Sequence, residues 1–341
     1  MSILEHTSRL TSLKNWLRES CSPAASKFEL EPLINDASSR QYFRLRLEDN
    51  LSQIAMIAPP DKENIIAFIA IAKDFSRQGI YTPEILAYNL EQGFMLLSDL
   101  GNDLFLNILN HTTVDDLYNR ALSVIHQIQT CNPKLPDDKP LDLFNEEFIR
   151  FELAIFIDWF LKKHLALTIT DEISSILENT FKILIHSAQE QPQVCVHRDY
   201  HSRNLLLLEN KKVGVLDFQD AVYGPITYDA ASLLRDAYID WPKSQVDQWI
   251  LKFYDMLNIN HQFSPETFIR WFDLISLQRH LKILGIFTRL NYRDNKPHYL
   301  PMISRLLDYI GKTCEDYSEL SHFKEILQTK IKPKLYEKEK Q

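Results

Sequence analysis

The chain has 341 residues, of which 45% are hydrophobic and 25% are charged, as in an ordinary globular protein large enough for two lobes. Its formal net charge of −8 argues against a general nucleic-acid-binding surface, which needs clustered lysine and arginine. Four scattered cysteines suggest a reducing compartment, and no apolar stretch is long enough to span a bilayer. We therefore expect a cytoplasmic protein that binds neither nucleic acid nor a membrane.

Apolar periodicity predicts the elements of the first hundred residues. An amphipathic pattern predicts a helix over 7–20, and a second helix is expected over 62–78, before Gly79. Runs typical of strands occupy residues 28–34, 41–48, 53–58, 83–90 and 94–99. These elements predict a small N-terminal lobe, residues 1–98, in which one helix is inserted among five strands.

The remainder, residues 99–341, is predicted to be a larger and mostly helical C-terminal lobe. Helical periodicity covers residues 114–130, 145–164 and 171–189, and resumes from about residue 227. Two short, hairpin-like strands interrupt the helices.

The chemistry is concentrated in the stretch around these strands, 194-VCVHRDYHSRNLLLLENKKVGVLDFQDA-221. It places Asp199, Asn204 and Asp217 close to apolar runs, where a carboxylate needs a proton, a cation or good hydrogen bonds. The pattern HxDxxxxN, followed by a strand and an aspartate, has the spacing of a kinase catalytic loop. We predict that Asp199 orients an acceptor hydroxyl and takes its proton, while Asn204 and Asp217 hold Mg²⁺ against nucleotide phosphates.

The motifs HRDYHSRN and LDFQD resemble those of the aminoglycoside phosphotransferase/choline kinase superfamily. Longer segments, among them 36-DASSRQYFRL-45, 94-FMLLSDLG-101 and 278-QRHLKILGIFTRLNYRD-294, resemble the bacterial anomeric kinases for N-acetylmuramate and N-acetylglucosamine, which act in cell-wall recycling. The resemblance implies an α+β, two-lobed, protein-kinase-like fold with a five-stranded antiparallel sheet. It also implies ATP and Mg²⁺ as cofactors, an amino-sugar substrate, and a functional link to a sugar-1-phosphate nucleotidyltransferase.

The phosphate-binding part departs from the usual kinase pattern. No glycine precedes Gly79, so a GxGxxG loop is absent, and the turn with Ser38, Ser39 and Arg40 takes its place. These hydroxyls and the guanidinium can bind phosphate. The third strand also lacks the lysine that pairs with a glutamate of the next helix. Arg40 or Arg44 could supply the missing charge, and Glu63, expected to start that helix, is left without its usual partner.

The kinase-like fold also implies where adenine binds and how the catalytic loop is held. Adenine is expected at the backbone of the link between the lobes, around Ser98 and Leu100. Asp229 resembles the family's structural aspartate, which ties a helix to the backbone of the catalytic loop.

The acceptor pocket is expected between the helix at 145–164, the segment after Asp217 and the helix of Arg279. On the first helix Glu152 and Trp159 share a stripe with Phe156 and Lys163, and a carboxylate beside an aromatic face suits a sugar.

Three further side chains are candidates for the sugar. Asp220 could accept from a hydroxyl, and Arg203 or Arg279 could bind the lactyl carboxylate of N-acetylmuramate. Both arginines could instead form structural ion pairs, and the aromatic residues of the stripe could be core.

The function expected from these observations is ATP-dependent phosphorylation of the anomeric hydroxyl of an amino sugar. The alternatives are a kinase of aminoglycosides, choline or other small metabolites, and a non-catalytic nucleotide-binding pseudokinase, which the missing strand lysine would favour.

Overall fold

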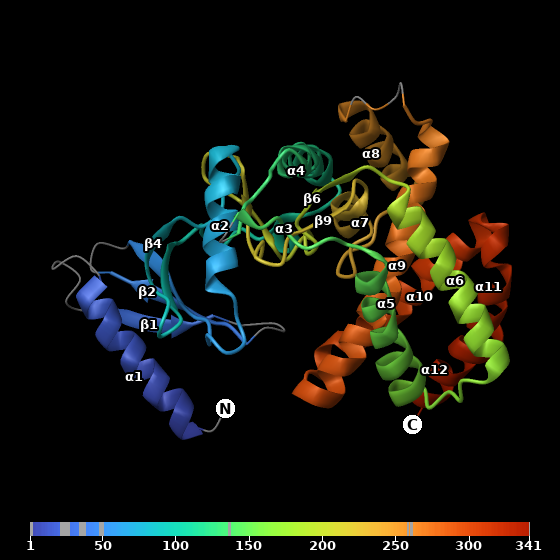
Figure 1. Cartoon of the computed structure of the whole chain (residues 1–341), viewed down its shortest axis with the longest axis horizontal. Helices are drawn as coiled ribbons and strands as arrows, with labels where there is room; N and C mark the ends of the chain where they lie inside the picture. Colours follow the sequence, from blue (N-terminus) through green and yellow to red (C-terminus); the bar gives the residue numbers. More distant parts are fainter. Residues whose placement is uncertain are drawn as a thin grey trace. The chain divides into compact units, whose positions relative to one another are not determined.

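The structure, a computed structural model, describes residues 3–20, 28–33, 39–47, 51–135, 138–257, 259 and 262–340. The chain divides into two compact units (Figure 1). The N-terminal unit comprises Met1–Asp103, Asn132–Pro140 and Leu206–Gln219; the C-terminal unit comprises Leu104–Cys131, Leu141–Leu205 and Asp220–Gln341. Asp217 therefore belongs to the first unit, while Asp199 and Asn204 belong to the second.

Five antiparallel strands form the sheet of the N-terminal unit, in the order β1-β2-β3-β5-β4, as predicted. They are β1 (Glu29–Pro32), β2 (Gln41–Arg46), β3 (Ser52–Ile57), β4 (Ile85–Asn89) and β5 (Phe94–Ser98). Helix α1 (Ile3–Ser20) packs on one face of the sheet. The core between them consists of Leu13, Trp16, Leu17, Phe43, Leu45, Ala55, Ile57, Phe94 and Leu96.

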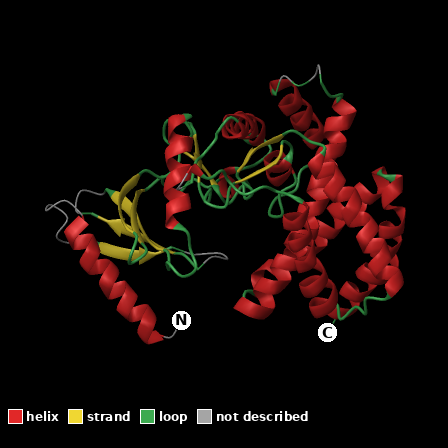
Figure 2. Ribbon diagram, in the orientation of Figure 1, coloured by secondary structure: helices red, strands yellow, loops and turns green. Residues whose placement is uncertain are grey.

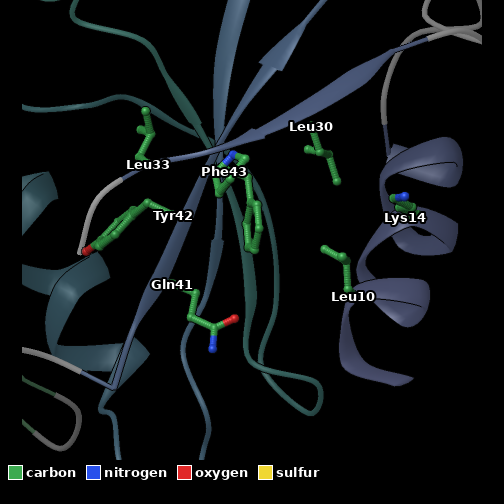
Figure 3. Close-up of a pocket in the computed structure, with 8 residues that line it drawn as sticks. Leu10, Lys14, Leu30, Leu33, Gln41, Tyr42 and Phe43 are labelled. Carbon is green, nitrogen blue, oxygen red and sulfur yellow. The ribbon is translucent and has the colours of Figure 1, made fainter. Parts of the chain in front are cut away.

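A hollow of about 320 Å³ lies between α1 and the β1–β2 side of this sheet (Figure 3). Its lining residues are mostly apolar, and Lys14 is the one charged residue among them. The lining consists of Leu10, Lys14, Leu30, Pro32, Leu33, Gln41, Tyr42 and Phe43. Such a lining offers little for a nucleotide phosphate.

Helix α2 (Ile65–Arg77) is capped by Asn64, whose side chain accepts from the Ala67 amide at 3.0 Å. Glu63 therefore precedes the helix, and the expectation that it starts the helix was wrong because Asn64 is the stronger N-cap residue. Along α2, Phe68 and Phe75 pack against the buried ring of Phe218, with centroids 4.6 and 5.8 Å apart. This packing fixes the segment that carries Asp217.

The C-terminal unit is mostly helical, as predicted, and is built around the long helix α9 (Pro265–Asp294) (Figure 2). Both sides of α9 are covered, because it packs against the chain at 156–164, α6, α7 and α10. The other helices are α3 (Phe105–Ile108), α4 (Val114–Gln129), α5 (Glu146–Ile155), α6 (Asp171–Gln189), α7 (Tyr228–Leu234), α8 (Lys243–Met256), α10 (Ile303–Asp316), α11 (Ser321–Ile326) and α12 (Lys332–Glu339). No helix of the described ranges is long and apolar enough to cross a membrane.

The single helix expected over 145–164 changes its winding partway. After α5 the chain continues as a π-helix, η3 (Phe156–His164), whose hydrogen bonds join residues five apart. Gly285 of α9 lies at the junction, where a Cβ atom would come within 2.5 Å of the Ile155 carbonyl carbon and oxygen. Only glycine allows the two backbones to approach so closely.

Short strands flank the catalytic motifs. β7 (Leu205–Leu207) and β8 (Val213–Val215) form the expected hairpin. A second pair, β6 (Gln193–Val196) with β9 (Val222–Pro225), was not predicted, because its partners are separated by the whole motif. The catalytic loop thus leaves β6 and ends where β7 begins.

Candidate active site

The catalytic loop, residues 197–204, is fixed by two buried aspartates. Asp229 of α7 accepts from the amide of His197 at 2.8 Å and from the amide of Arg198 at 3.0 Å, one bond to each carboxylate oxygen. This confirms the structural role expected for Asp229. Asp236 accepts from both the amide and the hydroxyl of Ser202, at 2.9 and 2.6 Å. The loop backbone is thereby held on both sides of Asp199.

The loop also orients its own polar side chains. The amide nitrogen of Asn204 donates to the Asp199 carbonyl at 2.9 Å, so the amide oxygen is the atom of Asn204 that can ligate a cation. Arg198 has φ 75°, in the left-handed region that is costly for a residue with a Cβ atom. Such backbone strain is typical of functional loops that the surrounding structure holds in place.

Asp199 carries a negative charge at neutral pH. Burial alone would raise its pKa, but the positive charges of Lys282 and Arg198 lower the pKa to about 2. An ionised carboxylate at this position can accept a hydrogen bond from an alcohol and align its oxygen.

Both cations belong to a buried cluster around Glu152. The carboxylate of Glu152 accepts from Arg198 at 2.9 Å, from Lys282 at 3.3 Å and from the Gln278 amide at 2.9 Å. Lys282 also donates to the Tyr228 hydroxyl at 3.1 Å. Burial would raise the pKa of Glu152, but Lys282 and Arg198 outweigh burial and lower it. The cluster therefore connects α5, α9 and α7 to the residue beside Asp199.

The stripe expected on the helix at 145–164 is not a regular face, because the π-helix begins after Glu152 and ends the 3.6-residue period. Glu152 and Phe156 are buried, Trp159 is half-buried and Lys163 is exposed.

Of the other sugar candidates, two lie at the catalytic loop and one lies in the core. Arg203 is half-buried, with its guanidinium 4.7 Å from the ring centroid of Tyr238. Asp220 is exposed, and its carbonyl accepts from Arg198 at 3.2 Å. Arg279 is 2% exposed, stacks on the Tyr228 ring and donates to Ser232 at 2.5 Å.

The N-terminal unit gathers the phosphate-side candidates around one arginine. Arg40 forms an ion pair with Glu63 at 2.5 Å, and its other terminal nitrogen lies 3.8 Å from Asp217. Glu63 also accepts from the Ser39 hydroxyl. Asp217 has φ 62°, again left-handed, and its carboxylate accepts from Gln219 at 2.7 Å. Ser38 lies outside the described residues.

Arg44 is bound to the segment that follows β5. Its guanidinium contacts Asp99 at 2.6 Å, Asn102 at 2.6 Å and the Gly101 carbonyl at 3.2 Å. Within the same segment Ser98 accepts from the Glu84 amide at 2.8 Å and, like Leu100, is half-buried. Arg44 thus stabilises the stretch where adenine is expected.

The donor atoms of the motif suit magnesium. One carboxylate and one amide oxygen, with phosphate oxygens and water completing the shell, are typical ligands of this ion. Among the described residues, no group of three or more His, Cys, Asp or Glu side chains could hold a metal alone. The donor type that each residue offers suits an ion whose shell is completed by phosphate oxygens and water.

Sequence reasoning missed the partners of Glu152 and the role of Asp236. Lys282 and Gln278 lie 130 and 126 residues from Glu152, so no local pattern relates them. The available signal was the segment 278-QRHLK-282, in which four of five residues are polar or charged between apolar neighbours. Such residues are rarely buried unless they are paired.

Two solved structures share the fold of this chain. Ethanolamine kinase from Plasmodium vivax matches with a TM-score of 0.64 and 11% identity, covering 88% of this chain and 86% of that one. The ADP-bound aminoglycoside phosphotransferase APH(2'')-Ib matches with a TM-score of 0.56 and 16% identity, covering 89% and 98%. The chain therefore has the kinase-like fold of these two proteins.

Sequence comparison narrows the class. The model of the phosphotransferase enzyme family APH matches residues 29–256, and the chain belongs to this family. A protein of Pseudomonas putida named N-acetylmuramate/N-acetylglucosamine kinase is 37% identical, over 95% of this chain and 97% of its own length. The protein of the same name from Pseudomonas aeruginosa is 38% identical, over 94% of this chain and 96% of its own.

Proposed function

We propose that this chain is a kinase that uses MgATP to phosphorylate the anomeric hydroxyl of N-acetylmuramate and N-acetylglucosamine, giving the sugar 1-phosphate. The observation that carries the proposal is its near full-length similarity, at 36 to 38% identity, to three relatives named for these two sugars. The reaction would serve peptidoglycan recycling. A nucleotidyltransferase that consumes sugar 1-phosphates is the functional partner we propose.

Asp199 is the proposed catalytic residue. Its carboxylate would accept a hydrogen bond from the anomeric hydroxyl and direct the oxygen at the γ-phosphorus. With a pKa of about 2, Asp199 is a weak base, which suits a loose transition state in which the hydroxyl proton leaves late. Its main contribution is therefore to orient the hydroxyl. Asp199 is itself held in place by the loop's backbone hydrogen bonds to Asp229 and by the charges of Lys282 and Arg198.

Asn204 and Asp217 are the proposed ligands of Mg²⁺. Asn204 belongs to the C-terminal unit and Asp217 to the N-terminal unit. The proposal that they share one ion therefore rests on the spacing of the motif and on their donor atoms. The bound ion would neutralise charge on the phosphate oxygens. Ser38, Ser39 and Arg40 are proposed to bind phosphate, and the backbone around Ser98 and Leu100 to bind adenine.

The proposed sugar contacts come from the C-terminal unit. Arg203 lies near the end of the catalytic loop, and Asp220 lies in the segment that follows Asp217. Trp159 offers a half-buried ring. Glu152 and Arg279 are buried, so their proposed contribution is to hold the neighbours that contact the sugar.

The test is incubation of the purified chain with MgATP and either N-acetylmuramate, N-acetylglucosamine, kanamycin or choline, followed by phosphorus NMR. A phosphate signal coupled to the anomeric proton is expected with the two amino sugars. Phosphorylation of kanamycin or choline alone would overturn the proposed substrate class. Nucleotide binding without turnover on any acceptor would indicate a pseudokinase.

A further inference from the structure

The N-terminal unit contains the glutamate of the usual lysine–glutamate pair, Glu63. The strand that should supply the lysine, β3, lacks it. β3 has the sequence SQIAMI and contains no cation. Glu63 is nevertheless half-buried just before α2, and one of its carboxylate oxygens lies 2.5 Å from a guanidinium nitrogen of Arg40. In kinases of this fold the corresponding pair positions the nucleotide phosphates.

The cation comes from the neighbouring strand. Arg40 immediately precedes β2, and the register pairs Gln41 with Ile57 at the end of β3. The Arg40 side chain therefore starts beside the end of the strand that lacks the lysine. It is 8% exposed and lies between Glu63 and the proposed metal ligand Asp217, 2.5 and 3.8 Å from their carboxylate oxygens.

Arg44, the other candidate, is committed elsewhere. Arg44 lies four residues after Arg40, within β2. Its guanidinium is bound by Asp99, Asn102 and the Gly101 carbonyl. These partners all follow β5. The structure thus separates two arginines that the sequence left equivalent.

We infer that Arg40 replaces the strand lysine as a phosphate-binding residue, with Glu63 as its positioning residue. This inference rests on the proposed function only in that the phosphates belong to a nucleotide. A guanidinium presents a planar fork of donors, so it can bind a phosphate while keeping its bond to Glu63. The hydroxyl of Ser39, bound to Glu63, holds the carboxylate from its other oxygen.

The experiment compares binding of MgADP and adenosine, measured by calorimetry, in wild type and in Arg40→Gln. MgADP binding should weaken about tenfold to one-hundredfold, as expected for loss of a charged hydrogen bond. Adenosine, which has no phosphates, should bind equally well to both. Equal MgADP affinity, or an equal loss for adenosine, would overturn the inference.

The matched control is Arg46→Gln. Arg46 lies at the end of β2, the strand that Arg40 immediately precedes, and pairs with Glu31, but both side chains are more than half exposed. MgADP binding should change by less than about twofold in this variant. A loss as large as that of Arg40→Gln would mean that strand charge in general, not Arg40, sets the affinity.

Glu63→Gln retains the Arg40 side chain but removes the carboxylate that positions it, and this variant also serves where Arg40→Gln does not fold. It should raise KM for ATP with a smaller change in kcat, because the guanidinium is no longer held. Unchanged MgADP affinity would contradict the positioning role. Failure of the wild type to phosphorylate amino sugars would overturn the proposed function, while a selective loss of MgADP binding would still support the role of Arg40.

Discussion

Glu152 of α5 and Lys282 of α9 form an ion pair of 3.3 Å in which both side chains are almost completely buried. Removing one partner of such a pair leaves an uncompensated buried charge. Glu152→Gln should lower the free energy of unfolding by about 3–5 kcal/mol, measured by urea denaturation. The control is Glu178→Gln, whose exposed pair with Arg150 should contribute at most about 1 kcal/mol. Equal losses in the two variants would contradict the account.

The pH dependence of stability has two limbs of opposite sign. Glu152 has a lowered pKa, so its contribution is present above its ordinary value of 4.5 and is lost as the pH falls below it. Burial raises the pKa of Asp229 to about 7, so its contribution is complete below the ordinary 3.8 and is lost as the pH rises through 7.

Together these groups place the maximum stability between about pH 3.8 and 4.5, and stability should then decline as the pH rises to about 7. Thermal unfolding across this range should show a flatter acid limb in Glu152→Gln and a flatter alkaline limb in Asp229→Asn. Unchanged limbs would assign the pH dependence to other groups. Asp229→Asn should also lose stability at every pH, since an amide nitrogen would face the amide of His197 or Arg198.

Asp199→Asn tests the catalytic assignment. The side chain keeps its size but can no longer accept through two charged oxygens, so kcat should fall about 10²- to 10⁴-fold. Binding of MgADP and the urea midpoint should stay close to wild type. If turnover survives, the orienting group must be sought among other residues of the loop.

Arg203→Gln tests the recognition of the sugar acid. N-acetylmuramate carries a carboxylate that N-acetylglucosamine lacks, and Arg203 is held at the catalytic loop by the Tyr238 ring. We expect kcat/KM for N-acetylmuramate to fall about tenfold or more, with about a twofold change for N-acetylglucosamine. An equal fall for both sugars would assign Arg203 a role in the loop itself.

Most of the fold could be predicted because the elements are marked by local patterns. Apolar runs typical of strands marked β2 and β3, and helical periodicity gave α6 its observed bounds, 171–189. The motif around Asp199 was equally visible, because its spacing is local. The pairing of β6 with β9 and the change to a π-helix after Ile155 depend on contacts between distant segments, which no such pattern records.

The site was less predictable for the same reason. Glu152 could be chosen from its helix, but its partners Arg198, Gln278 and Lys282 meet it only when α5, α9 and the catalytic loop pack together. The choice between Arg40 and Arg44 likewise needed the positions of Glu63 and Asp99, since the two arginines are only four residues apart, one just before β2 and one within it.

Gly285 has a consequence for how this chain can vary. It lies one helical turn from Lys282 on α9 and meets the backbone at Ile155, three residues beyond Glu152. The missing side chain therefore sets the spacing at which the two charges meet. A single methyl group there would push α9 away from the backbone at Ile155. The displacement would be passed through Glu152 to Arg198 and the catalytic loop, although the methyl group contacts neither. Tolerance to substitution at this position should thus resemble that of an active-site residue, although its own chemistry is inert.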